Sequence, residues 1–357
     1  MYFTHPQFKK FTLKPFLRGF SEIELKNKLN KLFPNRYIVF TDSGRSAFQV
    51  AIKELNLENS EMIVPAYICD IFKPIFECCN IKPIYIDVDL KTFNLQSDEI
   101  EKAITPNTKS ILVCHTYGYP NDMNKIKELA KKYNLKIIED CARAFGIKYP
   151  STSSGQAYLG NFGDCSIFSL PKFLPATSGG ILVSKKPIDA KLSKPELKFK
   201  TLIKFIRLFP LLAAITEEFR IKENTIKTIK PGIPRTASKQ SLRVFSWYLD
   251  NFEEQFNRRN ELIRYFKQGL EKINIYIPEQ TTYVSALIPN RDELLDKSRK
   301  HNIYCSRTWH NPLYSPPAGG LPNTQKAAEQ IINFPLQNWF TKKDIDKIIS
   351  CISEEMG

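Results

Sequence analysis

Several features are missing from the sequence, and each absence narrows the kind of protein it can encode. The first residues, MYFTHPQFKKF, contain no uninterrupted apolar run of signal-peptide length, so secretion is not expected. None of the eight cysteines falls in a paired CxxC spacing, which argues against a structural zinc site, and no metal is expected. Most cysteines lie inside apolar runs, which favours buried free thiols in a reducing compartment. We therefore expect a cytoplasmic protein. The sequence also contains no internal repeat or low-complexity tract.

Acidic residues are scarce relative to basic ones. Fifty-two lysines and arginines stand against 37 aspartates and glutamates, which leaves a formal charge of +15. This excess favours an anionic partner: a nucleotide, a phosphorylated sugar, nucleic acid or an acidic membrane surface. Nucleic acid is not expected, because no recognisable binding motif or basic helix accompanies the charge. The length of 357 residues, 42% of them hydrophobic, is enough for one large domain and a smaller one.

Short β-rich runs alternate with helical patterns from about residue 38 to 184. This alternation is typical of an α/β domain with a largely parallel sheet. The expected strands are 38–40, 62–65, 82–88, 110–114, 135–140, 164–169 and 179–184. Helical spacing of apolar residues predicts helices at 46–55, 98–104 and 123–133, and Pro74 weakens the case for a fourth at 70–79.

The alternation stops after residue 184. Residues 185–235 combine many lysines with the apolar stretch 202–215, and we expect a divergent helical segment that Pro210 would kink. From residue 236 onward, the apolar period predicts one long helix that leads into a smaller domain. The expected organisation is an amino-terminal segment (1–37) packing with the small domain, a large domain (38–235) and a small carboxyl-terminal domain (236–357).

The basic apolar stretch 198–222 has two interpretations. It could lie on an anionic membrane surface, since lysines and arginines interleave with large apolar residues. Burial in a dimer interface is the simpler explanation, and we favour it.

Ser43, Gly44, Arg45 and Ser46 open a predicted helix directly after an apolar strand. The unbonded amides and the positive end of the helix dipole make such a junction a site for an anion, and Gly44 would let a phosphate approach the backbone. An ordinary capped helix start explains the same residues.

Asp140 falls at the carboxyl end of an expected strand, within IIEDCARAFG (137–146). Ligands of open α/β sheets gather at that edge, and a carboxylate that follows two isoleucines needs a cation or hydrogen bonds. The alternative is that Asp140 caps a helix that begins at Cys141.

Lys172 follows an expected strand that ends at Ser169, and apolar residues flank it. A lysine held there would lose hydration and have a depressed pKa, as an amine that forms a Schiff base requires. A solvated surface charge is the alternative.

Seven motifs together carry a family resemblance. In chain order they are SGRSA, VPAYICD, KPIYIDVD, HTYGYP, IIEDCARAFG, FGDCSIFSLPK and SGGILVS. Their order and spacing resemble the DegT/DnrJ/EryC1/StrS aminotransferases, clearly over residues 38–184 and more weakly at 291–303 and 334–349. The resemblance implies the aspartate-aminotransferase-like fold of the fold-type I transferases that depend on pyridoxal 5′-phosphate (PLP). In that α/β fold a large domain with a mainly parallel sheet is joined to a smaller α/β carboxyl-terminal domain.

The resemblance also implies roles for individual residues. Gly44 and Arg45 match the turn whose amides hold the cofactor phosphate, and Ser169 resembles the hydroxyl that joins them. Asp140 matches the carboxylate that pairs with the pyridine nitrogen and keeps the ring protonated. Lys172 matches the Schiff-base lysine, whose freed amine moves a proton as general acid and base.

The chain departs from the family pattern at several positions. The FSLPK segment is two residues shorter between Ser169 and Lys172 than is usual in the family. Cys69 stands where the family commonly places an aromatic ring against the cofactor. Tyr67 and His115 are the candidates to cover the ring instead, and for each the alternative is a packed core residue.

Arginine replaces a frequent glutamine at position 143, near the expected place of the cofactor's phenolic oxygen. The fixed charge of Arg143 would favour the phenolate and lower the pKa of the Schiff base. A spectral titration that Arg143→Gln leaves unmoved would contradict this expectation.

Three further residues are candidates for holding a substrate carboxylate or phosphate: Arg235, Arg307 and His310. Residues 234–236 loosely resemble the family segment that reaches into the neighbouring subunit's site, which implies a homodimer with shared active sites.

The resemblance implies transfer of an amino group from an amino acid, glutamate by expectation, to a nucleotide-linked keto sugar in surface-glycan or amino-sugar biosynthesis. One alternative is PLP-dependent sugar dehydration, but relatives with that activity replace the Schiff-base lysine with histidine, and Lys172 argues against it. Another is a PLP-binding regulator or scaffold without turnover, which Cys69, the short FSLPK loop and the divergent segment 185–235 would suit.

Overall fold

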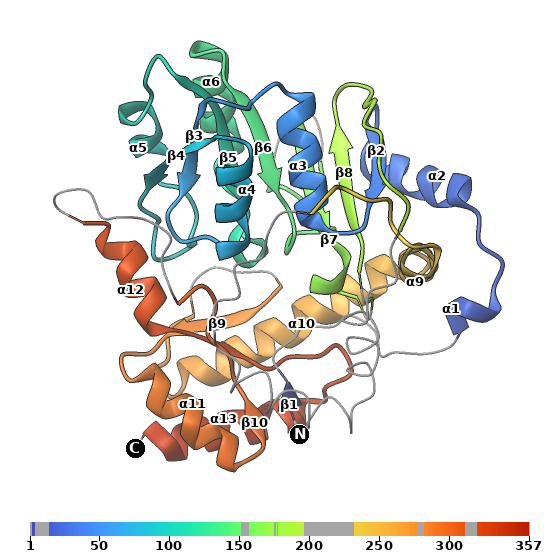
Figure 1. The fold of residues 1–357 in the computed structure, drawn as a ribbon. Coiled ribbons are helices and arrows are strands. Elements are labelled where there is room, and N and C mark those ends of the chain that lie inside the picture. The colour runs from blue at the N-terminus through green and yellow to red at the C-terminus, as the bar shows by residue number, and fades with distance from the viewer. Residues whose placement is uncertain are drawn as a thin grey trace.

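The computed structural model describes residues 2–3, 14–150, 157–174, 176, 178–195, 232–277, 282–310 and 320–356. A large α/β domain sits over a smaller α/β domain, and helix α10 (Phe252–Glu271) runs between the large sheet and the rest of the small domain (Figure 1). The stretch 198–222 lies outside the described residues, as does most of 185–235. No helix among the described residues combines the length and apolar character needed to cross a membrane.

Seven strands form the sheet of the large domain, in the order β2-β8-β7-β6-β5-β3-β4. They are β2 (Tyr37–Thr41), β3 (Glu61–Pro65), β4 (Lys82–Ile86), β5 (Thr108–Cys114), β6 (Lys136–Asp140), β7 (Cys165–Ser169) and β8 (Gly180–Ser184). β8 runs antiparallel to both of its neighbours, and the other neighbouring pairs are parallel. All seven expected strands are confirmed, with ends that differ by no more than 2 residues.

Helices cover both faces of this sheet. On β6, Ile137 enters the core beneath α2 (Glu22–Leu32) and α6 (Met123–Lys132), whereas Ile138 enters the core beneath α3 (Gly44–Glu54) and α4 (Lys73–Cys78). This alternation follows from the two-residue period of a strand. Burial on both faces explains why the strands are almost continuously apolar in sequence.

The expected helices of the large domain are also confirmed. They are α3, α5 (Ser97–Lys102) and α6, together with a 3-10 turn (Asp70–Phe72) that leads into α4. Pro74 lies in the first turn of α4, where the missing N–H has no intrahelical partner to lose.

The long helix expected from residue 236 is instead two helices, α9 (Lys239–Leu249) and α10. Phe245 of α9 belongs to the core of the large domain, while the core of the small domain begins at Leu262, inside α10. The hydrophobic cores therefore divide the chain within α10 rather than near residue 236. The apolar period continues through both helices, so it does not reveal the break at Asp250 and Asn251.

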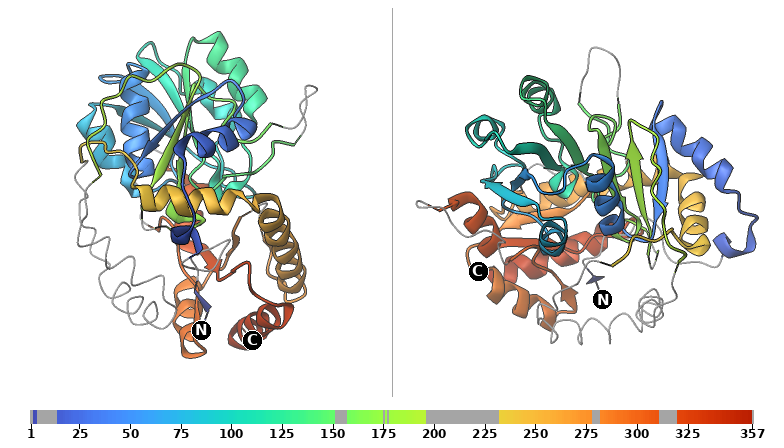
Figure 2. Two further views of the ribbon diagram at one scale, coloured as in Figure 1. Left: turned by 90° about the vertical axis from the view of Figure 1, so that its right-hand side faces the viewer. Right: turned by 45° about the horizontal axis from the view of Figure 1, so that its top comes forward.

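The small domain surrounds an antiparallel pair of strands. These are β9 (Val284–Leu287) and β11 (Ile331–Phe334), which pack with α10, α11 (Arg291–Lys300), α12 (Pro322–Gln330) and α13 (Lys342–Met356). β1 (Tyr2–Phe3) pairs with β10 (Ile303–Tyr304), so both ends of the described chain lie at this domain (Figure 2). In contrast, α1 (Lys14–Leu17) and α2 pack against α9, so the amino-terminal segment contacts both domains.

Candidate active site

The candidate site lies at the edge of the large sheet where the parallel strands end. Asp140 is the last residue of β6, His115 directly follows β5, and Lys172 ends the 3-10 turn (Leu170–Lys172) that follows β7. Because β8 runs in the opposite direction, its first residue, Gly180, lies at the same edge and pairs with Ser169. This edge faces the small domain (Figure 1).

The start of α3 forms an anion cradle at this edge. Ser43 caps the helix, its hydroxyl accepting the Ser46 amide at 3.2 Å. The amides of Gly44 and Arg45 lie in the first turn, where a helix has no internal acceptors for them. A Cβ built on Gly44 would come within 3.4 Å of the Ser169 Cβ, so Ser169 borders the same turn despite the short FSLPK segment. The geometry suits a phosphate group.

Gly180 makes the cradle compact. A Cβ at this position would lie 2.4 Å from the carbonyl carbon of Ser43 and 2.6 Å from the amide nitrogen of Gly44. Two backbone segments therefore meet at a distance that only glycine permits, because nothing at the contact is the flexible end of a side chain.

We expect Gly180→Ala to destabilise the protein by about 1–3 kcal/mol, as overpacking of a close contact does. It should also weaken PLP binding, because the peptide between Ser43 and Gly44 must move. Thermal unfolding and a PLP titration measure the two effects.

Gly44→Ala is the matched control for stability. Its Cβ would make only an ordinary contact at 3.4 Å, and alanine favours the helix, so the fold should be retained while the methyl group faces the cradle. A Gly180→Ala protein as stable as the wild type would contradict the close approach.

The Asp140 carboxylate is buried, with 7% of the residue exposed. Among the described residues its hydrogen-bond donors are the Ala142 amide, 2.9 Å from Oδ1, and the weakly donating Cys114 thiol, 3.7 Å from Oδ2. Burial raises the pKa of Asp140, and the Ala142 amide and the charge of Lys172 oppose this shift. A carboxylate of this kind is suited to a cation placed against Oδ2.

Lys172 and Cys69 border the same space as Asp140. Burial raises the pKa of the Cys69 thiol, and the charge of Lys172 opposes this shift most strongly. Lys172 is itself half-buried beside the buried Leu170 and Phe173. The end of β6 and the turn that follows β7 thus bring a carboxylate and an amine within electrostatic reach of each other.

His115 and Tyr67 have their polar atoms engaged in buried hydrogen bonds. The Nδ1 atom of His115 accepts the Asn121 amide at 3.2 Å, so Nε2 carries the proton and donates to Glu139 at 3.0 Å. The Tyr67 hydroxyl lies 2.9 Å from that of Tyr117. Each residue is 1% exposed, whereas Cys69 is half-buried.

Glu139 is a residue that the sequence analysis missed. Its carboxylate is fully buried and accepts, besides His115, the donors of Gly160, Phe162, Gly163 and Ser166. These bonds and His115 outweigh the effect of burial, and the pKa of Glu139 is lowered. His115, Glu139 and Cys141 lie close enough together to suggest a metal site, but the oxygens of Glu139 are already saturated with N–H and O–H donors.

The Arg143 side chain lies among aromatic rings. Its guanidinium carbon is 4.5 Å from the ring centroid of Tyr283, 5.1 Å from Trp309 and 5.5 Å from Tyr117. We call these three rings the aromatic cage. Tyr117 belongs to the large domain, whereas Tyr283 and Trp309 come from the small domain, and their own sequence surroundings gave no sign of this contact.

Thr282 ties the small domain to this part of the site. Its hydroxyl lies 2.8 Å from the carbonyl oxygen of Tyr117 and 3.0 Å from that of Arg143. The carbonyl of Thr282 accepts two N–H groups of the buried Arg259, whose third bond goes to the carbonyl of Leu336. Arg259 therefore positions the residue that contacts both loops.

The three substrate-binding candidates fall into two places. The carbonyl of Arg235 accepts the Asp42 amide at 2.8 Å, beside the anion cradle, while its side chain donates to the carbonyl of Lys194. Arg307 pairs with Asp292 at 3.0 Å in the small domain. Burial lowers the pKa of His310, and the charge of Arg307 adds to this effect, which places these two residues near each other.

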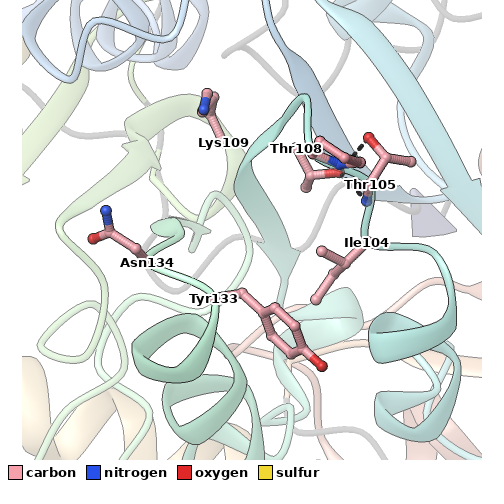
Figure 3. A pocket seen from close by; sticks show the side chains of 7 residues that line it. Ile104, Thr105, Thr108, Lys109, Tyr133 and Asn134 are labelled. Carbon is pink, nitrogen blue, oxygen red and sulfur yellow. Dashed lines mark hydrogen bonds between the residues drawn. The ribbon is translucent and has the colours of Figure 1, made fainter.

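A separate hollow of about 400 Å³ lies at the opposite edge of the sheet. Thr108 at the start of β5 and Tyr133 and Asn134 after α6 line it, as Figure 3 shows. The carboxyl ends of the strands, which carry Asp140, lie away from it. We assign it no part in the chemistry.

The fold and this site define a fold-type I PLP-dependent transferase. The residues present fit the cofactor: Gly44 and Ser169 form a cradle for a phosphate, and the buried Oδ2 of Asp140 has only a thiol as its donor among the described residues. Residues 14–353 match the model of the DegT/DnrJ/EryC1/StrS aminotransferase family. The chain belongs to this family, and it is a PLP-dependent aminotransferase.

Known proteins agree with this assignment. The chain is 37% identical over 383 aligned residues to the 3-oxo-glucose-6-phosphate:glutamate aminotransferase of Bacillus subtilis (strain 168), covering 98% of this chain and 78% of that protein. It is 37% identical over 166 residues to the GDP-perosamine synthase of Escherichia coli O157:H7, covering 45% of this chain and 44% of that protein. A putative sugar aminotransferase from Streptococcus pneumoniae, in its PMP form, superposes with a TM-score of 0.75 at 18% identity, over 99% of this chain and 98% of that one.

Proposed function

We propose that the protein transfers the amino group of glutamate to a nucleotide-linked keto sugar, in surface-glycan or amino-sugar biosynthesis. The observation that carries this proposal is the placement of Lys172 and Asp140 beside an anion cradle at one edge of the sheet. When bound, PLP supplies the aldehyde and the electron sink that such a transfer needs.

Each side chain has a proposed task. The Lys172 amine holds the cofactor and moves a proton at the substrate carbon, and Asp140 holds the proton on the pyridine nitrogen. Gly44, Arg45 and Ser169 hold the phosphate.

Other residues would line the cofactor ring and the substrate. Cys69 borders the ring, and Arg143 lies near the phenolic oxygen. His115, directly after β5, would lie beneath the ring, and its bond to Glu139 would hold the imidazole in place. Arg235, Arg307 and His310 remain proposed contacts to the anionic groups of a substrate.

A second acceptor class has its own support. The Bacillus subtilis relative, matched over nearly the whole chain, is named for 3-oxo-glucose 6-phosphate and for glutamate. A keto sugar that carries a simple phosphate is therefore the second candidate. The formal charge of +15 suits either acceptor, since both are anions.

The test is turnover with glutamate and a panel of acceptors. The PLP-loaded protein is incubated with nucleotide-linked keto sugars and, separately, with 3-oxo-glucose 6-phosphate, and release of 2-oxoglutarate is measured. Turnover with a nucleotide-linked sugar supports the first candidate, and turnover with the sugar phosphate alone supports the second. No release from any acceptor contradicts both.

We also propose a homodimer with shared active sites. Ile233, two residues before Arg235, is 69% exposed, as an interface residue would be in the isolated chain. Light scattering of the purified protein measures its mass in solution, and a monomer would contradict the proposal.

A further inference from the structure

The aromatic cage gives Arg143 an unusual environment for an arginine. Cation–π contacts with Tyr117, Tyr283 and Trp309 stabilise the guanidinium charge without using its N–H donors. Arginines with little exposure ordinarily pair with carboxylates or carbonyls, because each unpaired donor raises the cost of burial.

One donor atom of this guanidinium, Nη1, has no hydrogen-bond partner in the described part of the chain. Nη1 is buried and unpaired, and no described carboxylate forms an ion pair with Arg143. The residue as a whole is half-buried, so Arg143 is not enclosed on every side. A cation held at a fixed position, whose buried Nη1 has no acceptor among the described residues, suits an oxyanion.

The backbone of Arg143 and the rings around its guanidinium are held from both domains. The carbonyl of Arg143 accepts the Thr282 hydroxyl, and Arg259 holds Thr282 in turn. Tyr117 and Trp309 have left-handed backbone conformations, with φ of 51° and 49°, which bulky residues adopt only where the surroundings impose them. The cage is thus held in place, rather than a chance contact of mobile side chains.

Arg143 lies within electrostatic reach of the reactive groups. Its positive charge acts on the Asp140 carboxylate and on the Cys69 thiol, and the charge of Lys172 acts on both as well. An anion held by Arg143 would therefore interact electrostatically with the same groups as Lys172.

We propose that Arg143 is the subsite for an oxyanion of the substrate, either the α-carboxylate of the amino donor or the phosphate of the sugar acceptor. The identity of these ligands rests on the proposed function. Guanidinium groups bind carboxylates and phosphates through two parallel N–H donors, which fixes the orientation of the ligand. Five N–H donors allow this contact in addition to one with the phenolic oxygen of the cofactor.

Binding of unreactive anions separates the two sources. Glutarate carries carboxylates without an amino group, and glucose 6-phosphate carries a phosphate without a keto group. Their dissociation constants are measured by calorimetry with the PLP-loaded full chain, as wild type and as Arg143→Gln. Arg264→Gln is the matched control, because it removes the same charge from an exposed position on α10.

Arg143→Gln should weaken one of the two probes by about 10- to 100-fold, the loss expected for a charged bidentate contact. Loss of glutarate binding assigns the donor carboxylate, loss of glucose 6-phosphate binding assigns the sugar phosphate, and loss of both assigns a shared subsite. If neither probe weakens by more than about twofold relative to Arg264→Gln, the proposal is overturned.

Arg143→Lys covers the case in which Arg143→Gln does not fold or does not load PLP. It keeps the charge but lacks the planar fork, so a weakening of at least about threefold supports the proposal and wild-type affinity contradicts it. Because the assay measures binding without turnover, its result is independent of which keto sugar the enzyme accepts.

Discussion

Lys172→Ala is expected to lower the rate of transamination by about 10⁴-fold, the upper end of what one general acid–base side chain contributes. The same amine would attach the cofactor, so the variant loses both tasks. Steady-state release of 2-oxoglutarate measures the rate. Borohydride reduction followed by peptide mass analysis should place the cofactor on Lys172 in the wild type and on no lysine in the variant.

Two further variants separate chemistry from charge. Lys172→Arg keeps the positive charge near Asp140 but cannot form the bond to the cofactor, so it should be as inactive as Lys172→Ala. Lys148→Ala removes an exposed lysine of the same domain and should retain wild-type activity. Covalent labelling of a different lysine in Lys172→Ala would refute the assignment.

Asp140→Asn is expected to lower activity by at least about 10²-fold, comparable to the loss of one preorganised electrostatic contact. Asparagine can keep the 2.9 Å bond from the Ala142 amide, so the variant removes charge with little change of shape. Without this carboxylate, the chain would lack the group that holds a proton on the pyridine nitrogen of bound PLP, which would then be a weaker electron sink. The rate of the donor half-reaction, measured forward with glutamate and in reverse with 2-oxoglutarate, reports the effect.

The same substitution should stabilise the cofactor-free protein at neutral pH. Because burial raises the pKa of Asp140, the folded state binds this proton more tightly than the unfolded chain. The corresponding stability is present below the unfolded pKa of about 3.9 and is lost as the pH rises through the raised folded value. At neutral pH the cofactor-free wild type therefore contains a destabilising buried charge, and Asp140→Asn removes it.

Thermal unfolding with and without PLP checks this expectation. The Tm of Asp140→Asn should exceed that of the wild type without PLP, and PLP should raise it less. Asp164→Asn is the control, because the Asp164 carboxylate also accepts a backbone amide, that of Ile137, but at the opposite end of β6. A lower Tm for the cofactor-free Asp140→Asn protein would contradict the expectation, because it would mean that neighbouring groups already stabilise the buried charge of Asp140.

The sheet could be predicted from the sequence because its strands are buried on both faces. Burial on two faces requires continuous apolar runs, and Asp140 and Lys172 stand where such runs end. The helix start at Ser43 and Gly44 could be predicted too, since a capped helix start after a strand is a local pattern.

The surroundings of Arg143 could not be predicted in this way. The aromatic cage unites residues that lie 26, 140 and 166 positions from Arg143 in the chain, and no local pattern records such contacts. The break between α9 and α10 was missed for a related reason. It contains neither proline nor glycine, and the core does not change at the break, because Phe252 of α10 still packs in the core of the large domain.

Division of the cage between two domains has a thermodynamic consequence. Tyr117 belongs to one domain, and Tyr283 and Trp309 belong to the other. All three rings therefore surround the guanidinium only while the two domains are docked. Any ligand that prefers the caged form of Arg143 binds the docked arrangement selectively, and mass action then adds its binding free energy to interdomain docking. Ligand binding at Arg143 and docking of the two domains are then thermodynamically linked.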